Sequence, residues 1–212
     1  MLDLVATREC LACASGGEAV LCPDCAGEIG ARLKALPARN TLFSAAWSLG
    51  AYSGAIGALV RRAKFNLDLR AADLLVEQLQ SALREGFPAP VDAVVYVPTT
   101  PWRLMWRGFH LPERLAEVAA DAAGVPVVPA LRRTWGLAQA GRTHAERVAA
   151  GAELFRVRFP VSGHVLLVDD VLTSGASAHG AAAELLVAGA TSVSCLVLAA
   201  AGPLRRVPVG IS

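Results

Sequence analysis

Apolar positions along the chain fall into short continuous runs that alternate with segments of helical spacing. The runs at 91–97, 164–168 and 192–198 have the length of buried strands. Between them apolar residues recur at helical spacing, most clearly over 68–83, where Asp68 is the expected N-cap. Fully apolar strands separated by helices are typical of a parallel sheet covered on both faces. The pattern therefore predicts an α/β fold with an open parallel sheet and helices on both faces.

Capping residues and turns predict the remaining elements. Hydrophobic residues make up 54% of the chain and charged residues 18%, which excludes a disordered chain and supports a full core. The segment after the 91–97 strand is interpreted as a loop at the edge of the sheet. We also expect a strand over 42–51, a helix from Ser53 to about Phe65, a helix over 112–123, a strand over 125–128 and a helix over about 177–188.

Charge and hydropathy bear on the surroundings of the protein. The net charge is only +2, so no strong basic field argues for nucleic acid as an obligate ligand. The N-terminal residues lack a continuous apolar core, and the most apolar later stretch, 185–201, is interrupted by glycine, serine and threonine. We therefore expect a soluble, cytoplasmic protein without membrane insertion.

Four of the five cysteines crowd near the N-terminus in two Cys-x-x-Cys pairs, Cys10 with Cys13 and Cys22 with Cys25. Four thiolates at this spacing suit one tetrahedral zinc ion, because each pair can place both sulfurs on it. In a cytoplasmic protein such pairs indicate metal before disulfides, with a redox role as the alternative. Four cysteines fill the coordination shell, so the predicted zinc site is structural or an interaction surface rather than catalytic.

The cysteine pairs define a small module over residues 1–36. The segment between the pairs is rich in glycine and other small residues and cannot form a core, so we expect the module to need its metal to fold. Residues 37–41 are interpreted as the linker out of it, which makes 37–212 the main domain. Cys195, in an apolar run, is expected to be a core residue.

The strongest chemical signal is the segment 165–177, Val-Leu-Leu-Val-Asp-Asp-Val-Leu-Thr-Ser-Gly-Ala-Ser. A parallel strand ends at the carboxyl edge of its sheet, where open α/β folds bind ligands, and the next helix begins there with free amide groups. A glycine in this loop lets the backbone approach an anion, and hydroxyl groups add donors. The predicted phosphate-binding residues are Thr173, Ser174, Gly175, Ala176 and Ser177.

Two adjacent carboxylates, Asp169 and Asp170, precede this loop. They would repel a second phosphate, but an ionised carboxylate accepts hydrogen bonds from the two hydroxyls of a vicinal diol. A phosphate on the loop and a diol on the acids together describe a ribose 5-phosphate. The alternative is an ordinary turn with capping serine and threonine beside a solvated acid pair.

The run from hydrophobic residues through two acids to Thr-Ser-Gly-Ala-Ser resembles the signature of type I phosphoribosyltransferases. The resemblance implies that Asp169 and Asp170 hold the ribose hydroxyls as catalytic residues and that 173–177 bind the 5′-phosphate. It also implies 5-phosphoribosyl pyrophosphate as ligand, with magnesium on the pyrophosphate. In that family a base attacks the anomeric carbon as pyrophosphate leaves, and fixed carboxylates favour the positive charge on the sugar. No nucleophilic side chain is required, so positioning and electrostatics do most of the catalysis.

A four-cysteine module joined to such a domain resembles the ComF family of competence-associated proteins. Guanidinium and ammonium groups bind phosphate oxygens, and the alternative for each cation is a solvated surface residue. The segments that resemble the family are Tyr52-Ser53-Gly54, Arg61 to Phe65, Val97-Pro98, Arg103 to Phe109, and Leu131-Arg132-Arg133 with Gln139 and Arg147. The candidates for the pyrophosphate side are Lys64, Pro98, Thr99, Arg103 and Arg107.

The family resemblance implies a role in competence, in which the protein handles incoming single-stranded DNA in the cytoplasm with a helicase and recombination proteins. The sequence departs from the family at His110 and Leu111, where Asn and Gln usually follow Arg-Gly-Phe, and at 148–150, where an Asn is usual. The four histidines show no metal spacing and are expected to be ordinary polar groups. Two alternatives stay open, a nucleobase salvage transferase and a regulator that senses the ligand without turnover; the departures favour the regulator.

Overall fold

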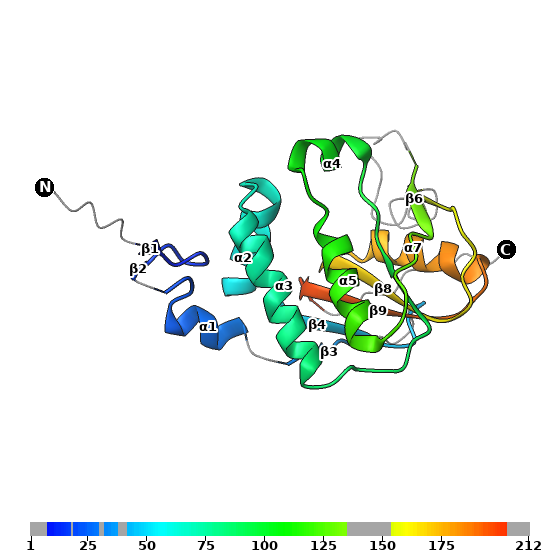
Figure 1. The fold of residues 1–212 in the computed structure, drawn as a ribbon, viewed down its shortest axis with the longest axis horizontal. Helices are drawn as coiled ribbons and strands as arrows, with labels where there is room; N and C mark the ends of the chain where they lie inside the picture. The colour runs from blue at the N-terminus through cyan, green and yellow to red at the C-terminus, as the bar shows by residue number, and fades with distance from the viewer. Residues whose placement is uncertain (1–7, 18, 30–31, 38–41, 135–153, 203–212) are drawn as a thin grey trace, which may run out of the picture.

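A computed structural model describes residues 8–17, 19–29, 32–37, 42–134 and 154–202. Within these ranges the chain forms a five-stranded sheet with helices on both faces, together with two small two-stranded ribbons (Figure 1). The predicted α/β architecture with a mostly parallel sheet is confirmed. None of the helices in these ranges is long and apolar enough to cross a membrane.

The sheet has the strand order β3-β4-β9-β8-β5. Neighbouring strands pair in parallel except β3, which pairs antiparallel with β4 at one edge. The carboxyl ends of the parallel strands therefore lie along one side of the sheet. In sheet order the strands are β3 (Lys34–Ala35), β4 (Ala46–Ala51), β9 (Ala190–Ala200), β8 (Gly163–Leu172) and β5 (Ala93–Tyr96).

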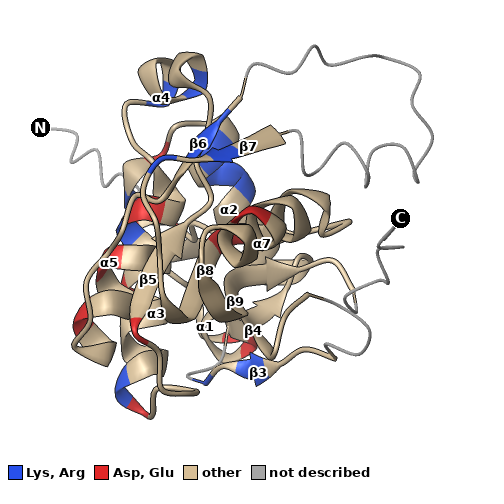
Figure 2. Cartoon of the chain, turned by 90° about the vertical axis from the view of Figure 1, so that its right-hand side faces the viewer, with Lys and Arg blue, Asp and Glu red and all other residues tan. Residues whose placement is uncertain are grey.

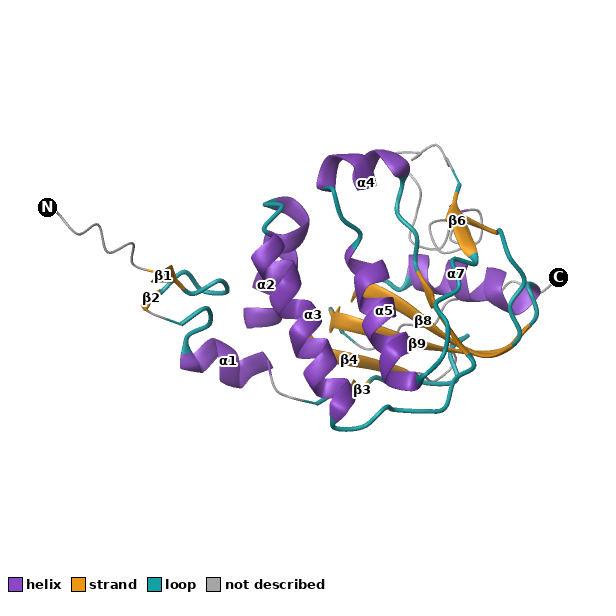
Figure 3. Ribbon diagram, viewed as in Figure 1, coloured by secondary structure: helices purple, strands orange, loops and turns teal. Residues whose placement is uncertain are grey.

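Helices cover both faces of the sheet (Figure 3). Three pack on one face and one on the other: α2 (Gly54–Phe65), α3 (Leu69–Arg84) and α5 (Leu111–Ala123), opposite α7 (Ala176–Val187). Successive residues of β8 alternate between the two cores, with Leu166 in the core under α5 and Leu167 in the core under α7. Strand β8 is apolar over this stretch because both of its faces are buried.

The remaining elements are short. They are β1 (Arg8–Glu9), β2 (Gly16–Gly17), α1 (Pro23–Ile29), α4 (Pro101–Arg107), β6 (Leu131–Arg133) and β7 (Phe155–Val157). Strands β1 and β2 pair with each other, as do β6 and β7, both antiparallel. Helix α1 contacts α2, and the Glu28 carboxylate accepts a hydrogen bond from the Ala55 amide at 3.1 Å. This contact joins the cysteine-rich segment to the N-terminus of α2.

Capping residues set several helix ends where the sequence predicts them. The Asp68 carboxylate accepts a hydrogen bond from the Arg70 amide at the start of α3. Gly124 follows α5 in the left-handed conformation, with φ 69°. Local chemistry at these positions therefore decides where the chain turns.

Strand β8 is longer than the apolar run that predicts it. It continues through Asp169 and Asp170 to Leu172, because this part stays in register with β9. The acid pair thus belongs to the strand and not to the loop. The strand expected over 125–128 is reduced to a single bridge between Val127 and Val94.

The segment after β5 contains helix α4, which corrects the predicted loop. Its start is capped by the Thr100 hydroxyl, which accepts a hydrogen bond from the Arg103 amide at 3.4 Å, and Pro101 fits its first turn. Gly108 ends it in the left-handed conformation with φ 72°. No residue of α4 is buried, so the helix contributes to neither of the two cores.

Candidate functional site

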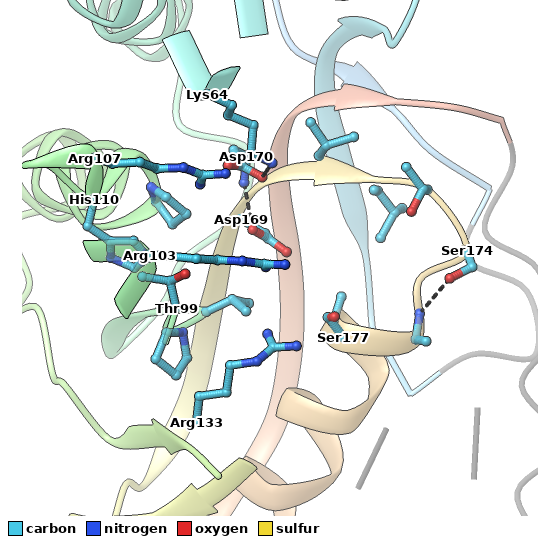
Figure 4. Close-up of a pocket in the computed structure, with 18 of the residues that line it drawn as sticks. Lys64, Thr99, Arg103, Arg107, His110, Arg133, Asp169, Asp170, Ser174 and Ser177 are labelled. Carbon is cyan, nitrogen blue, oxygen red and sulfur yellow. Dashed lines mark hydrogen bonds and ion pairs between the residues drawn. The ribbon is translucent and has the colours of Figure 1, made fainter. Parts of the chain in front are cut away.

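A cavity of about 550 Å³ lies at the carboxyl ends of β5 and β8 (Figure 4). Its walls come from the end of α2, the segment between β5 and α5, strand β6, and the loop from β8 into α7. All the residues predicted for ribose, phosphate and pyrophosphate binding line it. They are Lys64, Pro98, Thr99, Arg103, Arg107, Asp169, Asp170, Thr173, Ser174, Gly175, Ala176 and Ser177.

The acid pair lies where β8 reaches the cavity. Asp170 is only 6% exposed, and its carboxylate accepts a hydrogen bond from the Lys64 ammonium at 2.7 Å. The Asp169 carboxylate accepts one from the Asp170 amide at 2.8 Å. Burial, and then the neighbouring charge of Asp170, raise the pKa of Asp169 well above its ordinary value. The surroundings of Asp169 therefore compensate the negative charge of its carboxylate only in part.

The loop from β8 into α7 turns at a glycine in the left-handed conformation. Gly175 has φ 77°, and an added Cβ would lie 2.9 Å from Nδ1 of His179. Beneath the loop, the His179 ring is buried and its Nδ1 lies 2.8 Å from the Gly175 carbonyl oxygen. The Ser174 hydroxyl accepts a hydrogen bond from the Ala176 amide at 3.4 Å. In Figure 4, Ser177 stands in the first turn of α7 beside the cavity.

Three cations, Lys64, Arg103 and Arg107, form what we call the cationic wall of the cavity. The Arg107 Nε is buried and has no hydrogen-bond partner among the described residues. Burial lowers the pKa of Arg107, while the charge of Asp170 raises it. Figure 2 shows lysine and arginine positions on α2, α4 and β6 gathered at this end of the molecule. A buried guanidinium nitrogen without a partner favours an anionic ligand.

Further residues line the cavity although the sequence did not single them out as site residues, and four of them carry arginine, histidine or tryptophan side chains. Arg133 comes from β6 and lies over the Phe155 ring, with Cζ 5.4 Å from the ring centroid. His110 lies between α4 and α5 with only 8% of its side chain exposed, so it is a buried polar group rather than a surface one. Trp102 and Trp106 of α4 are 65% and 57% exposed.

Of the signals in the sequence, only the i, i+4 spacing of the two tryptophans could have pointed to one helix face. Arg133 belongs to the family-like segment 131–133 and His110 follows the predicted Arg107, but neither was predicted as a site residue, and the fold brings both to the cavity. The family-like residues Gln139 and Arg147 lie outside the described residues.

The sulfurs of Cys10, Cys13, Cys22 and Cys25 all lie within 4.8 Å of one another. Cys13 and Cys22 are 3.7 Å apart between sulfurs. Tetrahedral coordination with bonds of about 2.3 Å places sulfurs about 3.8 Å apart, so the four thiols can hold one metal ion.

The thiols of the cluster differ, because burial and the neighbouring thiols raise the pKa of Cys25 whereas the pKa of Cys10 is lowered. Burial raises the pKa of Cys10, but hydrogen bonds from the backbone amides of Cys13, Cys22 and Ala12 outweigh it and bring the pKa to about 6. Cys195, in contrast, is fully buried in β9, where burial raises its pKa. The prediction that Cys195 is a core residue is confirmed.

No family model matches the sequence, and no curated protein matches it significantly. Among solved structures, a glutamine phosphoribosylpyrophosphate amidotransferase from B. subtilis is 22% identical with a TM-score of 0.41, over 59% of this chain and 26% of that one. An adenine phosphoribosyltransferase from Saccharomyces cerevisiae is 18% identical with a TM-score of 0.37, over 84% and 90%. A purine phosphoribosyltransferase from Pyrococcus horikoshii is 20% identical with a TM-score of 0.32, over 65% and 76%. The chain thus spans about a quarter of the amidotransferase, at 26% of its length.

Proposed function

We propose that the cavity binds 5-phosphoribosyl pyrophosphate, or a nucleotide with the same ribose 5-phosphate. The observation that carries this proposal is the placement of Asp169 and Asp170 beside the loop 173–177 in one cavity. Loop amides and hydroxyls at the start of α7 suit a phosphate, and the carboxylates suit the two hydroxyls of the ribose. One ligand with both groups satisfies both parts of the site.

The charge of the cavity favours a polyanion over a sugar with a single phosphate. Lys64, Arg103, Arg107 and Arg133 line it, against the two carboxylates of the acid pair. An excess of positive charge beside the ribose position suits a pyrophosphate on the anomeric carbon.

Magnesium fits the donor set of this site. It prefers oxygen ligands and usually binds through one or two carboxylates together with substrate phosphates. Asp169 and Asp170 are the acids that would hold it, and the uncompensated environment of Asp169 would be relieved by a cation. When bound, magnesium neutralises charge on the pyrophosphate. The residues of the chain hold the sugar through the acid pair and the phosphate through the loop.

The same geometry suits transfer of the ribose phosphate to a base. Positive charge on the anomeric carbon is stabilised by fixed carboxylates beside the ribose, while the cationic wall stabilises the departing pyrophosphate. Pyrophosphate release that depends on an added purine or pyrimidine supports a salvage transferase. Binding without release, with any base, supports a regulator that senses the ligand.

The four-cysteine cluster is proposed to hold a structural zinc ion. All four ligand positions come from the chain, so none is open for catalysis. Glu28, on the same helix as Cys25, accepts a hydrogen bond from the first turn of α2. The metal would therefore fix the position of α1 against α2.

Calorimetric titration of the full chain with 5-phosphoribosyl pyrophosphate and magnesium tests the ligand proposal. We expect saturable heat, and a loss of affinity of about tenfold or more in Asp169→Asn, because a carboxylate partner of the ribose hydroxyls is removed. Asp121→Asn is the matched control, since Asp121 is exposed on α5 away from the cavity. Absence of heat with the unaltered chain, or equal affinity in Asp169→Asn, overturns the proposal.

A second candidate function is binding of single-stranded DNA, which the ComF resemblance implies for a competence protein. The specific observation in its favour is helix α4, which exposes Trp102 and Trp106 with Arg103 between them. Aromatic rings beside arginines form the stacking and charge pattern of single-strand binding sites.

Fluorescence anisotropy with labelled oligonucleotides, over a range of salt, tests this second candidate. Trp102→Ala with Trp106→Ala is expected to weaken binding about tenfold or more, since stacking contributes about 1–3 kcal/mol per base. The control is Phe159→Ala, because Phe159 is also exposed, at 46%, but does not line the cavity. Equal loss in both proteins, or no binding by the unaltered chain, contradicts a DNA surface on α4.

A further inference from the structure

The His110 side chain contacts Glu113 and Tyr96, which are hydrogen-bonded to each other. Its Nδ1 lies 3.8 Å from one carboxylate oxygen of Glu113, in the first turn of α5. The other Glu113 oxygen accepts a hydrogen bond from the Tyr96 hydroxyl at 3.1 Å. The Tyr96 ring packs against the imidazole edge to face, with centroids 5.3 Å apart. These contacts fix the ring with Nδ1 toward the carboxylate.

The other ring nitrogen has no such partner. Within the described residues, His110 Nε2 makes no hydrogen bond, although the residue lines the cavity. Three residues earlier, Arg107 Nε is also without a partner. Gly108, with φ 72°, turns the chain between them, and Figure 4 shows His110 beside Arg107. The Arg107 Nε–H needs an acceptor, and an anion that supplied it would also lie beside His110 (Figure 4), whose Nε2 can donate once the ring is protonated.

Burial and the surrounding charges both act on the protonation of the ring. Burial lowers the pKa of His110 below its ordinary value, and an anion beside Nε2 would raise it. The groups that face the ring are Glu113 on α5, Tyr96 on β5, Arg107 on α4, Asp170 on β8 and Lys64 on α2. The two acids favour imidazolium and the two cations oppose it. Tyr96, with a pKa of about 12, stays neutral at neutral pH.

We propose that His110 is a ligand-binding residue that takes up a proton when an anionic ligand occupies the cationic wall. The proton comes from solvent onto the neutral imidazole, and no other bond forms or breaks. The imidazolium then donates from Nε2 to a phosphate oxygen, while Nδ1 faces the Glu113 carboxylate. Glu113 is a positioning residue in this arrangement, since it acts on the ligand only through His110. The inference rests on the proposed pyrophosphate ligand.

Proton uptake has a defined consequence for affinity. Since the bound state holds more protons, binding weakens as pH rises through the range between the free and bound values of the His110 pKa. One linked proton changes affinity by roughly tenfold per pH unit at most. The ligand phosphates and Asp169 also titrate. The proton uptake due to His110 is therefore measured as the difference between the unaltered chain and a variant that has no titratable group at position 110.

The test is calorimetric titration of the full chain with 5-phosphoribosyl pyrophosphate and magnesium, in two buffers of different ionisation enthalpy at one pH. The variant is His110→Gln, whose amide can still donate to phosphate but cannot be protonated. We expect the unaltered chain to take up roughly 0.3–1 proton more per ligand than this variant. Glu113→Gln, which can still accept from Tyr96, should also lower the uptake. His164→Gln, at the opposite end of β8, is the control and should keep it.

Three outcomes overturn the inference. Equal uptake in the unaltered chain and His110→Gln, with binding intact, overturns it and leaves the proposed ligand standing. If His110→Gln fails to fold, uptake in Glu113→Gln equal to that of the unaltered chain has the same meaning. No binding by the unaltered chain overturns both the proposed function and this inference.

Discussion

The Lys64 ammonium donates a hydrogen bond to the Asp170 carboxylate at 2.7 Å and joins the end of α2 to the end of β8. Both side chains are largely buried, with 21% and 9% of their surfaces exposed. At its other end α2 is held by Glu28 of α1, which accepts from the Ala55 amide. One helix therefore connects the cysteine-rich segment to the acid pair of the cavity.

Replacing Lys64 by methionine keeps the aliphatic stem but leaves the Asp170 carboxylate buried without its partner. Breaking a buried pair from one side costs about 3–5 kcal/mol, and the partial exposure of Lys64 reduces the expected loss in unfolding free energy to about 2 kcal/mol. Urea unfolding of the full chain measures it. The control is Arg70→Met, because Arg70 pairs with Asp68 but is 73% exposed, so its loss should stay below about 1 kcal/mol. Similar losses in the two variants would contradict this account of the pair.

Gly175 is the loop position where a side chain is least tolerated. Gly175→Ala places a methyl group 2.9 Å from His179 Nδ1 and keeps alanine at φ 77°. We expect a loss of about 1–3 kcal/mol in unfolding free energy and weaker ligand binding, since relief of the strain displaces the loop amides. Gly27→Ala in α1, where a methyl group meets nothing within 4 Å, should be neutral or stabilise by up to about 1 kcal/mol. Unchanged stability and calorimetry in Gly175→Ala would show that the loop does not need its glycine.

Most of the fold could be predicted because its signals are local. The apolar run at 164–168 and the cap at Asp68 each depend on neighbouring residues, and both fall where the structure has them. The extension of β8 to Leu172 could not be predicted, because a pair of acids interrupts the apolar run. The extension forms because β8 continues to pair with β9, where Asp169 lies opposite Val197.

The candidate site divides in the same way. The acid pair and loop 173–177 are contiguous in sequence, so their chemistry could be predicted as a unit, and the structure brings them into one cavity. His110, between α4 and α5, and Arg133, in β6, reach the cavity through packing that leaves no short-range pattern. Helix α4 was not predicted because it spans only 7 residues and buries none of them, so its i, i+4 pair of tryptophans is too short a pattern to indicate a helix.

Metal content distinguishes the zinc proposal from a redox role for the cysteines. We expect about one zinc per chain by elemental analysis, and substantial loss of it in Cys13→Ser, since the coordination shell would lack one sulfur. Chelation should lower the temperature of unfolding and expose four thiols to a thiol reagent. Cys195→Ala removes a thiol distant from the cluster and should keep the zinc. Zinc-free protein with disulfides between the paired cysteines would support the redox role instead.

We expect Asp169 to lower the free energy of unfolding although it contributes to ligand binding. The pKa of Asp169 is raised in the folded state, so below its unfolded pKa of about 3.9 the carboxyl group is neutral in both states and costs no stability. Stability is lost as the pH rises from that value toward the raised pKa of the folded state. Asp169→Asn keeps an oxygen that can accept from the Asp170 amide and removes the charge. At pH 7 the free energy of unfolding of the variant should therefore be larger than that of the unaltered chain by roughly 0.5–2 kcal/mol, although the variant binds ligand more weakly.

Urea unfolding at pH 4, 5.5 and 7 checks the sign of this effect. The advantage of Asp169→Asn should shrink toward the lowest pH, where the carboxyl of the unaltered chain is protonated and resembles the amide. Other titrating groups are shared by the two proteins and cancel in the difference. Asp121→Asn, on the exposed side of α5, should show no such dependence. A variant less stable than the unaltered chain at pH 7 would mean that the fold already compensates the charge of Asp169. The acid pair would then gain nothing electrostatically from binding a cation or a diol.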